Sequence, residues 1–254
     1  MSAVKDRVDR DGALLRLRLD RPKANLIDAA MIAALGSALA AYRGKPGLRG
    51  VLLDAEGPHF SFGASVEEHL PDQCAAMLGS INGLLLSMLE FPAPILVAVR
   101  GQCLGGGLEV ALACSLIFAA ENARFGQPEI KLGVFAPAAS GLLPYRVNQP
   151  MAEDLLLSGR SIGAAEARSC GLVHAVADDP EAAALAWFDE HLADKSAAAL
   201  ACAVTAARVG MLNEVRSRLA EVERLYLDRL MQTRDANEGL AAFLEKRKPN
   251  WEHR

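Results

Sequence analysis

Aromatic residues are scarce in this chain: Phe, Trp and Tyr together make up 5% of its 254 positions. Hydrophobic residues as a class still reach 52%, so the core has to be built from Ala, Leu and Val. Basic charge is not in excess either, since the formal net charge is −4 at pH 7. This balance excludes the broad positive surface that binds nucleic acids, and leaves any anionic ligand to a few local basic residues.

The sequence also lacks the marks of a secreted, metal-binding or membrane protein. Its five cysteines are scattered and form no CxxC pair, which favours reduced thiols over disulfides or a zinc site. The five histidines show no HxxxH or HExxH spacing, so we expect no metal, and we interpret His69, near a motif, as a packing or rim residue. The N-terminal MSAVKDRVDRDGALL lacks the apolar centre of a signal peptide, and no apolar run approaches the roughly 20 residues of a membrane span. We therefore expect a cytoplasmic protein that binds no membrane.

Strand and helix patterns alternate through the first two thirds of the chain, which predicts an α/β core with parallel strands. Strands are expected at 13–19 (half-exposed), 50–54, 95–101 and 116–120, and helices at 27–43 and 73–89. Residues 125–141 are expected to form a long irregular connection. Beyond residue 150 helices are expected at 152–157, 164–169, 181–191, 197–211 and 213–234. We divide the chain into a core, 1–195, and a C-terminal helical region, 196–254.

The segment GQCLGGGLE, residues 101–109, places three glycines and a glutamate at the head of an apolar helix. Each glycine weakens a helix by roughly 1 kcal/mol relative to alanine, and a carboxylate entering a buried segment is costly without a task. The run could be only a tight connection between strand and helix. It is neither a GxGxxG dinucleotide motif nor a phosphate loop that ends in GK[ST].

Two further loops contain small or acidic residues: FSFGAS at 60–65 and FGQPEIKLG at 125–133. Helix-opening turns of Gly and Ala leave backbone N–H groups unpaired, and two such turns that face each other can hold a developing oxyanion. Glu109 and Glu129 lie on different elements, 20 positions apart. If they converge, they form an acid/base pair, although Glu129 alone would be an ordinary loop residue.

These segments, together with RPKAN and the terminal AFLEKRKPNW, resemble the crotonase (enoyl-CoA hydratase/isomerase) superfamily from about residue 8 to residue 251. The resemblance implies a spiral of β-β-α repeats with a C-terminal α-helical trimerisation region at 196–254. It implies a homotrimer or a dimer of trimers, and an acyl-CoA thioester as substrate. No separate cofactor is implied, because coenzyme A is part of the substrate.

The resemblance also implies roles for individual residues. Ala64 and Gly106 match the positions whose amides form the oxyanion hole, and Glu109 and Glu129 match the two catalytic glutamates of the hydratases. Possession of both glutamates favours water addition, but the sequence does not decide which is the acid and which the base. The implied substrate- and CoA-binding positions are Lys23, Ala24, Ser61, Phe62, Gly63, Ser65, Val66, Leu104, Gly105, Pro128, Gly133 and Lys246.

Two segments depart from fatty-acid hydratases. Where these tend to read FAAGAD, this chain has FSFGAS, and FAPAASG at 135–141 replaces a glycine-rich stretch. Both segments resemble the cyclohexa-1,5-diene-1-carbonyl-CoA hydratases of anaerobic benzoyl-CoA degradation, which form 6-hydroxycyclohex-1-ene-1-carbonyl-CoA. The alternatives are a general 2-enoyl-CoA hydratase of fatty-acid or side-chain degradation, a Δ3,Δ2-isomerase, and a non-catalytic member that binds acyl-CoA or RNA. The isomerase needs only one base, and both glutamates and the acidic charge argue against a non-catalytic member.

Overall fold

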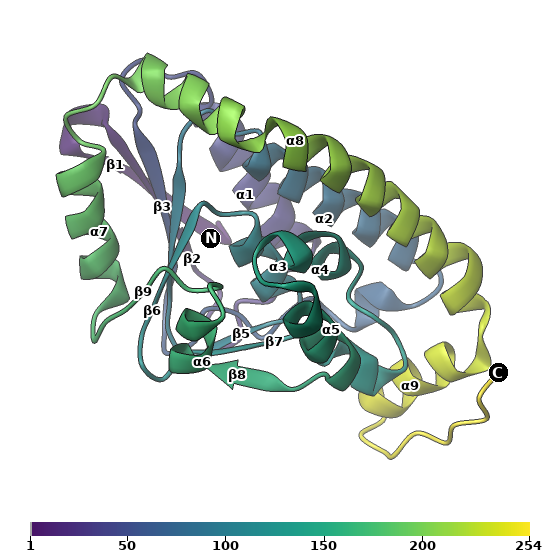
Figure 1. The fold of residues 1–254 in the computed structure, drawn as a ribbon. Helices are drawn as coiled ribbons and strands as arrows, with labels where there is room; N and C mark the ends of the chain where they lie inside the picture. The colour runs from purple at the N-terminus through teal and green to yellow at the C-terminus, as the bar shows by residue number, and fades with distance from the viewer. Residues whose placement is uncertain (1) are drawn as a thin grey trace.

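The computed structural model describes residues 2–254, and a six-stranded sheet forms the centre of the fold (Figure 1). The first strand pairs antiparallel with the second, and all the other pairs in this sheet are parallel. The strand order is β1 (Val4–Asp9), β2 (Leu14–Leu19), β3 (Gly50–Ala55), β4 (Ile95–Val99), β6 (Leu116–Ala119) and β9 (Ala175–Val176). A second sheet has the order β5 (Gln102–Leu104), β7 (Arg124–Gly126) and β8 (Ser161–Gly163).

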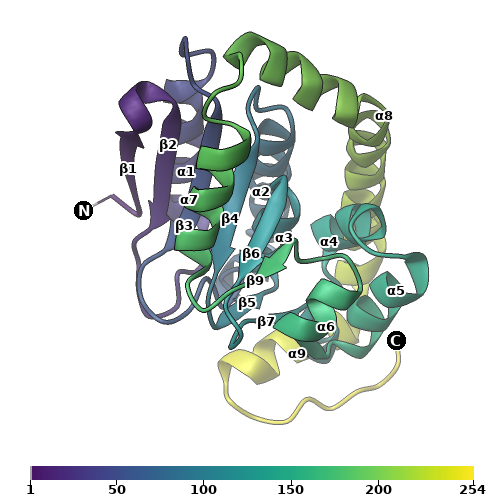
Figure 2. The same cartoon turned by 60° about the vertical axis from the view of Figure 1, so that its left-hand side comes forward.

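Both faces of the large sheet are covered by helices, as Figure 2 shows. Along β3, Val51 and Leu53 face the larger apolar cluster, which includes α1 (Ala29–Tyr42) and α2 (Cys74–Leu89). Leu52 faces the opposite cluster under α7 (Pro180–His191). Because side chains alternate across a strand, a strand buried on both faces is a continuous apolar run, which explains the sequence GVLLDA.

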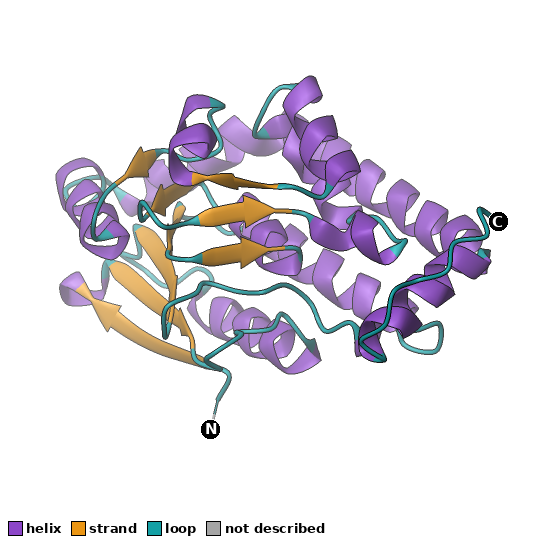
Figure 3. Cartoon of the chain, turned by 90° about the horizontal axis from the view of Figure 1, so that it is seen from below, coloured by secondary structure: helices purple, strands orange, loops and turns teal. Residues whose placement is uncertain are grey.

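Figure 3 shows the sheet from below with helices packed around it. The remaining α-helices are α3 (Gly106–Leu112), α4 (Pro137–Leu142), α5 (Gln149–Ser158), α6 (Ala164–Ser169), α8 (Ala197–Arg224) and α9 (Arg234–Leu244). The shorter turns are η1 (Arg10–Gly12), η2 (Glu67–His69), η3 (Pro128–Leu132), η4 (Leu143–Tyr145), the π-helical η5 (Leu225–Arg229) and η6 (Leu230–Gln232).

Three predictions about elements were wrong, and strand β1 was missed. The strand predicted at 13–19 is not half-exposed, because Arg16 on β2 is buried against Asp54 at 3.2 Å and also pairs with Glu181. Strand β1 was not predicted, because its sequence VKDRVD has charged residues at its centre and lacks the alternation of apolar and polar residues that indicates a strand. The connection at 125–141 is not irregular, because it contains η3 and α4. The two helices predicted at 197–211 and 213–234 are one helix, α8, followed by η5 and η6.

The C-terminal region 196–254 has two parts. Helix α8 crosses the molecule beside α2 and α4 and leaves much of its first half exposed (Figure 1). By length and composition the segment Ala197–Gln232 could cross a membrane, a test that core helices of soluble proteins also pass, and 6% of its most apolar window is buried. Helix α9 instead folds back against η3. Trimerisation through this region stays a prediction.

Candidate active site

The loop 60–65 is an extended segment that lies between strand β5 and the segment around Ile27. The Ser61 amide donates to Gln102 at 2.9 Å, and the Ser61 carbonyl accepts from Leu104 at 3.1 Å. On the other side, the Gly63 carbonyl accepts from the Ile27 amide at 2.9 Å. The buried Ser61 hydroxyl oxygen accepts from the Gly63 amide at 3.1 Å and so fixes the bend inside the loop. These bonds align the loop with the glycine run, residues 105–107.

The amides of Ala64 and Gly106 become neighbours as a result. A Cβ atom built on Gly106 would lie 3.2 Å from the Ala64 nitrogen. Among residues 2–254, neither amide donates to a protein acceptor. The next glycine, Gly107, has no room for a side chain, because its Cβ would lie 2.5 Å from the Ser61 Cβ. Two neighbouring backbone donors without a protein acceptor are what an oxyanion hole requires.

One part of the expected geometry was wrong. Both turns were expected to open helices, and Gly106 does so as the first residue of α3. Ala64 does not, because it forms a parallel bridge with Ile27, and the helical turn η2 begins only at Glu67. The Ala64 amide is therefore left free by the alternation of an extended segment and not by a helix start.

Glu109 lies in the interior of α3 and is buried with 5% of its surface exposed. Its Oε1 accepts a hydrogen bond from the Ala139 amide in α4 at 2.9 Å. Burial raises the pKa of Glu109 to about 7, against the opposing effect of the hydrogen bonds from Ala139 and Ala138. The carboxyl is thus held in place while remaining able to carry a proton near neutral pH.

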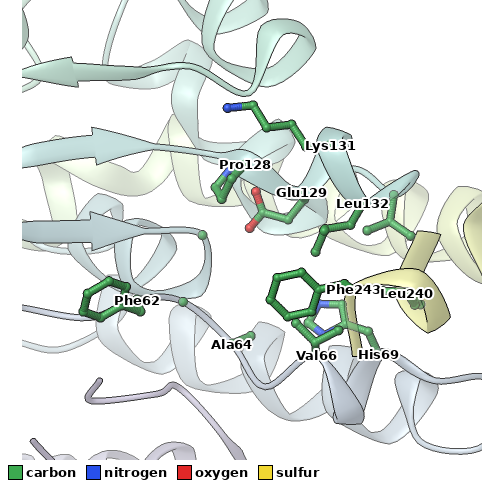
Figure 4. Close-up of a pocket in the computed structure, with 13 residues that line it drawn as sticks. Phe62, Ala64, Val66, His69, Pro128, Glu129, Lys131, Leu132, Leu240 and Phe243 are labelled. Atoms are coloured by element: carbon green, nitrogen blue, oxygen red, sulfur yellow. The ribbon is translucent and has the colours of Figure 1, made fainter. Parts of the chain in front are cut away.

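Glu129 follows Pro128 in η3 and points into a cavity (Figure 4). In the orientation that satisfies its hydrogen bonding, the amide nitrogen of Gln127 donates to both Glu129 carboxylate oxygens at 3.1 Å. Burial and, second, the negative charge of Glu109 raise the pKa of Glu129 to about 8. The two carboxyl groups therefore lie within each other's field and titrate as a pair.

The cavity has a volume of about 310 Å³ and a mostly apolar wall. Of the residues that the sequence predicted for the site, it is lined by Phe62, Gly63, Ala64, Val66, Gly105, Pro128 and Glu129. The other lining residues are His69, Lys131, Leu132, Val134, Leu240 and Phe243. For Leu240 and Phe243 no local signal was available, because α9 reaches the cavity from more than a hundred positions further along the chain.

Several predicted site residues do not line this cavity. The buried Ser61 supports the loop behind it, and Glu109 is buried in α3 outside the lining. The Ser65 hydroxyl bonds to Glu67 at 2.7 Å on the surface. The other predicted residues outside the lining are Lys23, Ala24, Leu104, Gly106, Gly133 and Lys246. Contacts of Lys23 and Lys246 with coenzyme A stay predictions.

His69 was interpreted as a packing or rim residue, and it lies in the cavity wall. Its Nδ1 is 2.7 Å from the Ser65 carbonyl oxygen, so this nitrogen carries the proton. Burial lowers the pKa of His69 and keeps the ring neutral. Within residues 2–254 there is no cluster of three or more His, Cys, Asp or Glu side chains that could hold a metal ion.

Comparison of the sequence with known proteins gives its family and two relatives. A model of the enoyl-CoA hydratase/isomerase family matches residues 9–254. The chain belongs to this family. It is 64% identical to the cyclohexa-1,5-dienecarbonyl-CoA hydratase of Thauera aromatica, over 100% of this chain and 98% of that protein. It is 34% identical to a probable enoyl-CoA hydratase of Bacillus subtilis, over 99% of both chains.

Solved structures of the family share the fold. An enoyl-CoA hydratase/isomerase from Pseudoalteromonas atlantica superimposes with a TM-score of 0.85 at 31% identity, over 98% of this chain and 99% of that one. An enoyl-CoA hydratase from Mycobacterium avium subsp. paratuberculosis also gives 0.85 at 27% identity, over 99% of both chains. The crotonase-type fold that was expected from the sequence motifs is confirmed.

Proposed function

We propose that this protein adds water to cyclohexa-1,5-diene-1-carbonyl-CoA and forms 6-hydroxycyclohex-1-ene-1-carbonyl-CoA. The observation that carries the chemistry is an apolar cavity lined by Glu129 and Ala64, with the Gly106 amide next to that of Ala64 and the buried Glu109 close enough to raise the pKa of Glu129. The choice of substrate is supported by the 64% identity, over the whole chain, to a hydratase of that name.

In the proposed reaction the amides of Ala64 and Gly106 bind the thioester oxygen. Water adds at the ring β-carbon, and the electron pair of the α,β double bond moves onto the thioester oxygen. Because the second double bond is conjugated with this enolate, the charge also reaches a ring carbon two positions beyond the α-carbon. Protonation there leaves one double bond conjugated with the thioester, and water has been added without any redox change. The two amides stabilise the intermediate because they already point at the developing charge.

Glu109 and Glu129 supply the proton transfers. Burial raises the pKa of both carboxyls, and the charge of Glu109 raises that of Glu129 further, so the pair retains a proton near neutral pH. The ionised member can then accept the proton of the attacking water, while the protonated member donates to the ring carbon. The apolar wall excludes other water and strengthens both interactions.

A turnover assay with a panel of CoA thioesters tests this function. We expect kcat/KM for the cyclic dienoyl-CoA to exceed that for crotonyl-CoA by at least about 100-fold, a difference of about 3 kcal/mol in transition-state binding. A preference for crotonyl-CoA would instead indicate a general 2-enoyl-CoA hydratase. Binding without turnover of any enoyl-CoA would indicate a non-catalytic acyl-CoA-binding protein.

We propose further that the protein works in the cytoplasm as a homotrimer or a dimer of trimers. The support is the exposed first half of α8, where Val209 has 58% of its surface accessible. Lys23 and Lys246 would meet the phosphates of coenzyme A, and no other cofactor or metal would be needed. Light scattering of the purified protein tests the assembly, and a monomeric mass would contradict it.

A further inference from the structure

Tyr226 is a buried phenol whose hydroxyl group has no hydrogen-bond partner among residues 2–254. The chain has three tyrosines, and the other two hydroxyls are paired on the surface. Tyr42 donates to Asp6 at 2.8 Å, and Tyr145 donates to Glu214. Leaving a buried hydroxyl unpaired costs free energy, so this group calls for an explanation that packing does not give.

Tyr226 packs against the segment that joins the elements holding the two carboxyls. It lies in the π-helical turn η5, and its ring meets Phe135 edge-on with the ring centroids 5.3 Å apart. Phe135 belongs to the short segment between η3, which carries Glu129, and α4, whose Ala139 amide holds Glu109. Turns of the π type are rare and occur frequently at functional sites.

Three ionisable groups from three elements act on the phenol. Burial has the largest effect on its pKa, and the fields of Cys74 in α2, Glu129 in η3 and Glu109 in α3 also raise it. The phenol is therefore protonated throughout the neutral range and is available as a hydrogen-bond donor. Among residues 2–254 no carboxylate oxygen accepts from it directly, so the hydroxyl is free to donate to a bound water molecule.

We infer that Tyr226 is a positioning residue of the active site, whose hydroxyl donates a hydrogen bond to the water molecule that Glu109 and Glu129 orient for addition. The inference rests on the proposed hydratase function. A water molecule that donates one hydrogen to a carboxylate and accepts one from a phenol keeps a lone pair free for the β-carbon. Tyr226 itself exchanges no proton, and no bond to it is formed or broken.

The variant Tyr226→Phe tests the role because it removes only an oxygen that has no protein partner. Its melting temperature should equal or exceed that of the wild type. On the enoyl-CoA that the wild type hydrates fastest, kcat should fall between about 10-fold and about 100-fold while KM stays constant. The acidic limb of the pH profile should move to higher pH, because the ionised carboxylate loses support from the phenol-bound water.

Tyr42→Phe and Tyr145→Phe are matched controls and should retain wild-type kcat. If Tyr226→Phe keeps wild-type kcat and an unmoved pH profile, the hydroxyl is a packing group and the inference fails. A loss of kcat that accompanies a lowered melting temperature would also overturn it, because the oxygen would then be structural. Failure of the proposed function is seen separately, as absence of hydration by the wild type.

Discussion

Two regions of the chain meet at the cavity, and they contribute in different ways. The core supplies groups that are fixed by backbone geometry: the Ala64 amide in an extended loop, the glycine run, and Glu129 after a proline. The C-terminal region supplies apolar side chains, Leu240 and Phe243, from one amphipathic helix. The core therefore provides the oxyanion-hole amides and the two carboxyls, while helix α9 of the C-terminal region provides part of the shape of the acyl pocket.

The two regions are nevertheless tightly joined at one place. A Cβ atom on Gly133, directly after η3, would lie 2.8 Å from the Asp235 carbonyl oxygen, and one on Gly239 would clash with the Leu132 carbonyl. Helix α9 thus rests with its backbone against the turn that carries Glu129. Close backbone approach of this kind requires glycine on both sides.

Removing the acid/base groups of the core should have the largest effect on turnover, and so tests most strongly the difference between the two regions. Glu109→Gln and Glu129→Gln keep the shape and one acceptor of each side chain but abolish its proton transfer. We expect kcat to fall about 10²- to 10⁴-fold for each change, which is typical of general acid–base catalysis. Steady-state hydration rates measure this effect.

Binding of a saturated acyl-CoA should remain within a few-fold of wild type in both variants, as calorimetry can measure. Glu221→Gln, an exposed residue on α8, is the matched control and should leave kcat unchanged. Normal turnover in either active-site variant would remove that carboxyl from the mechanism.

A substitution in the glycine run should cause the next largest fall in kcat. Gly105 has a φ of +48°, and a Cβ atom there would lie 2.5 Å from the Glu129 Oε1. Gly105→Ala should therefore displace the carboxylate and lower kcat by about 100-fold, since small misplacements of reacting groups are costly.

Gly79→Ala is the control, because Gly79 lies in α2 with nothing within 4 Å of its Cβ position. That change should raise stability by about 0.5–1 kcal/mol without affecting kcat. Equal kcat values for the two variants would show that the glycine run is only a tight connection.

The sequence indicated the position of the core part of the site, while the roles of its residues came from the family resemblance and the C-terminal part of the cavity gave no local signal. Gly106 and Glu109 lie in the first turn of α3, directly after a strand, where the local pattern indicated a helix-opening turn. The same pattern wrongly placed Ala64 in such a turn, although Ala64 lies in an extended segment. The packing of α9 against η3 depends on Gly133 and Gly239. These two glycines are far apart in sequence, and no periodic pattern indicates that they meet. The burial of Tyr226 likewise depends on long-range packing, because its helix is otherwise mostly exposed.

The raised carboxyl pKa values also predict a cost in stability. The pKa of Glu109 rises from an ordinary value of 4.5 to about 7, and that of Glu129 to about 8. The folded state therefore holds these protons more tightly than the unfolded state, and stability falls as the pH rises from about 4.5 to about 8.

Glu109→Gln should remove part of this slope. Its advantage in melting temperature over the wild type should be absent near pH 4.5 and largest near pH 8, as thermal unfolding across that range can measure. The Gln oxygen can still accept from the Ala139 amide, so the hydrogen bond is preserved. A difference between the two proteins that does not change with pH would contradict the assigned burial effect.

The smallest expected effect lies in the C-terminal wall. Phe243 has 53% of its surface exposed, so Phe243→Ala should cost about 1 kcal/mol of acyl binding, or about a five-fold rise in KM. Leu157→Ala, an exposed apolar residue on α5, should leave KM unchanged. Because the helix supplies shape and no proton transfer, kcat should remain within about two-fold of wild type. A large fall in kcat at constant KM would show that Phe243 acts in the chemistry and that α9 supplies more than the shape of the pocket.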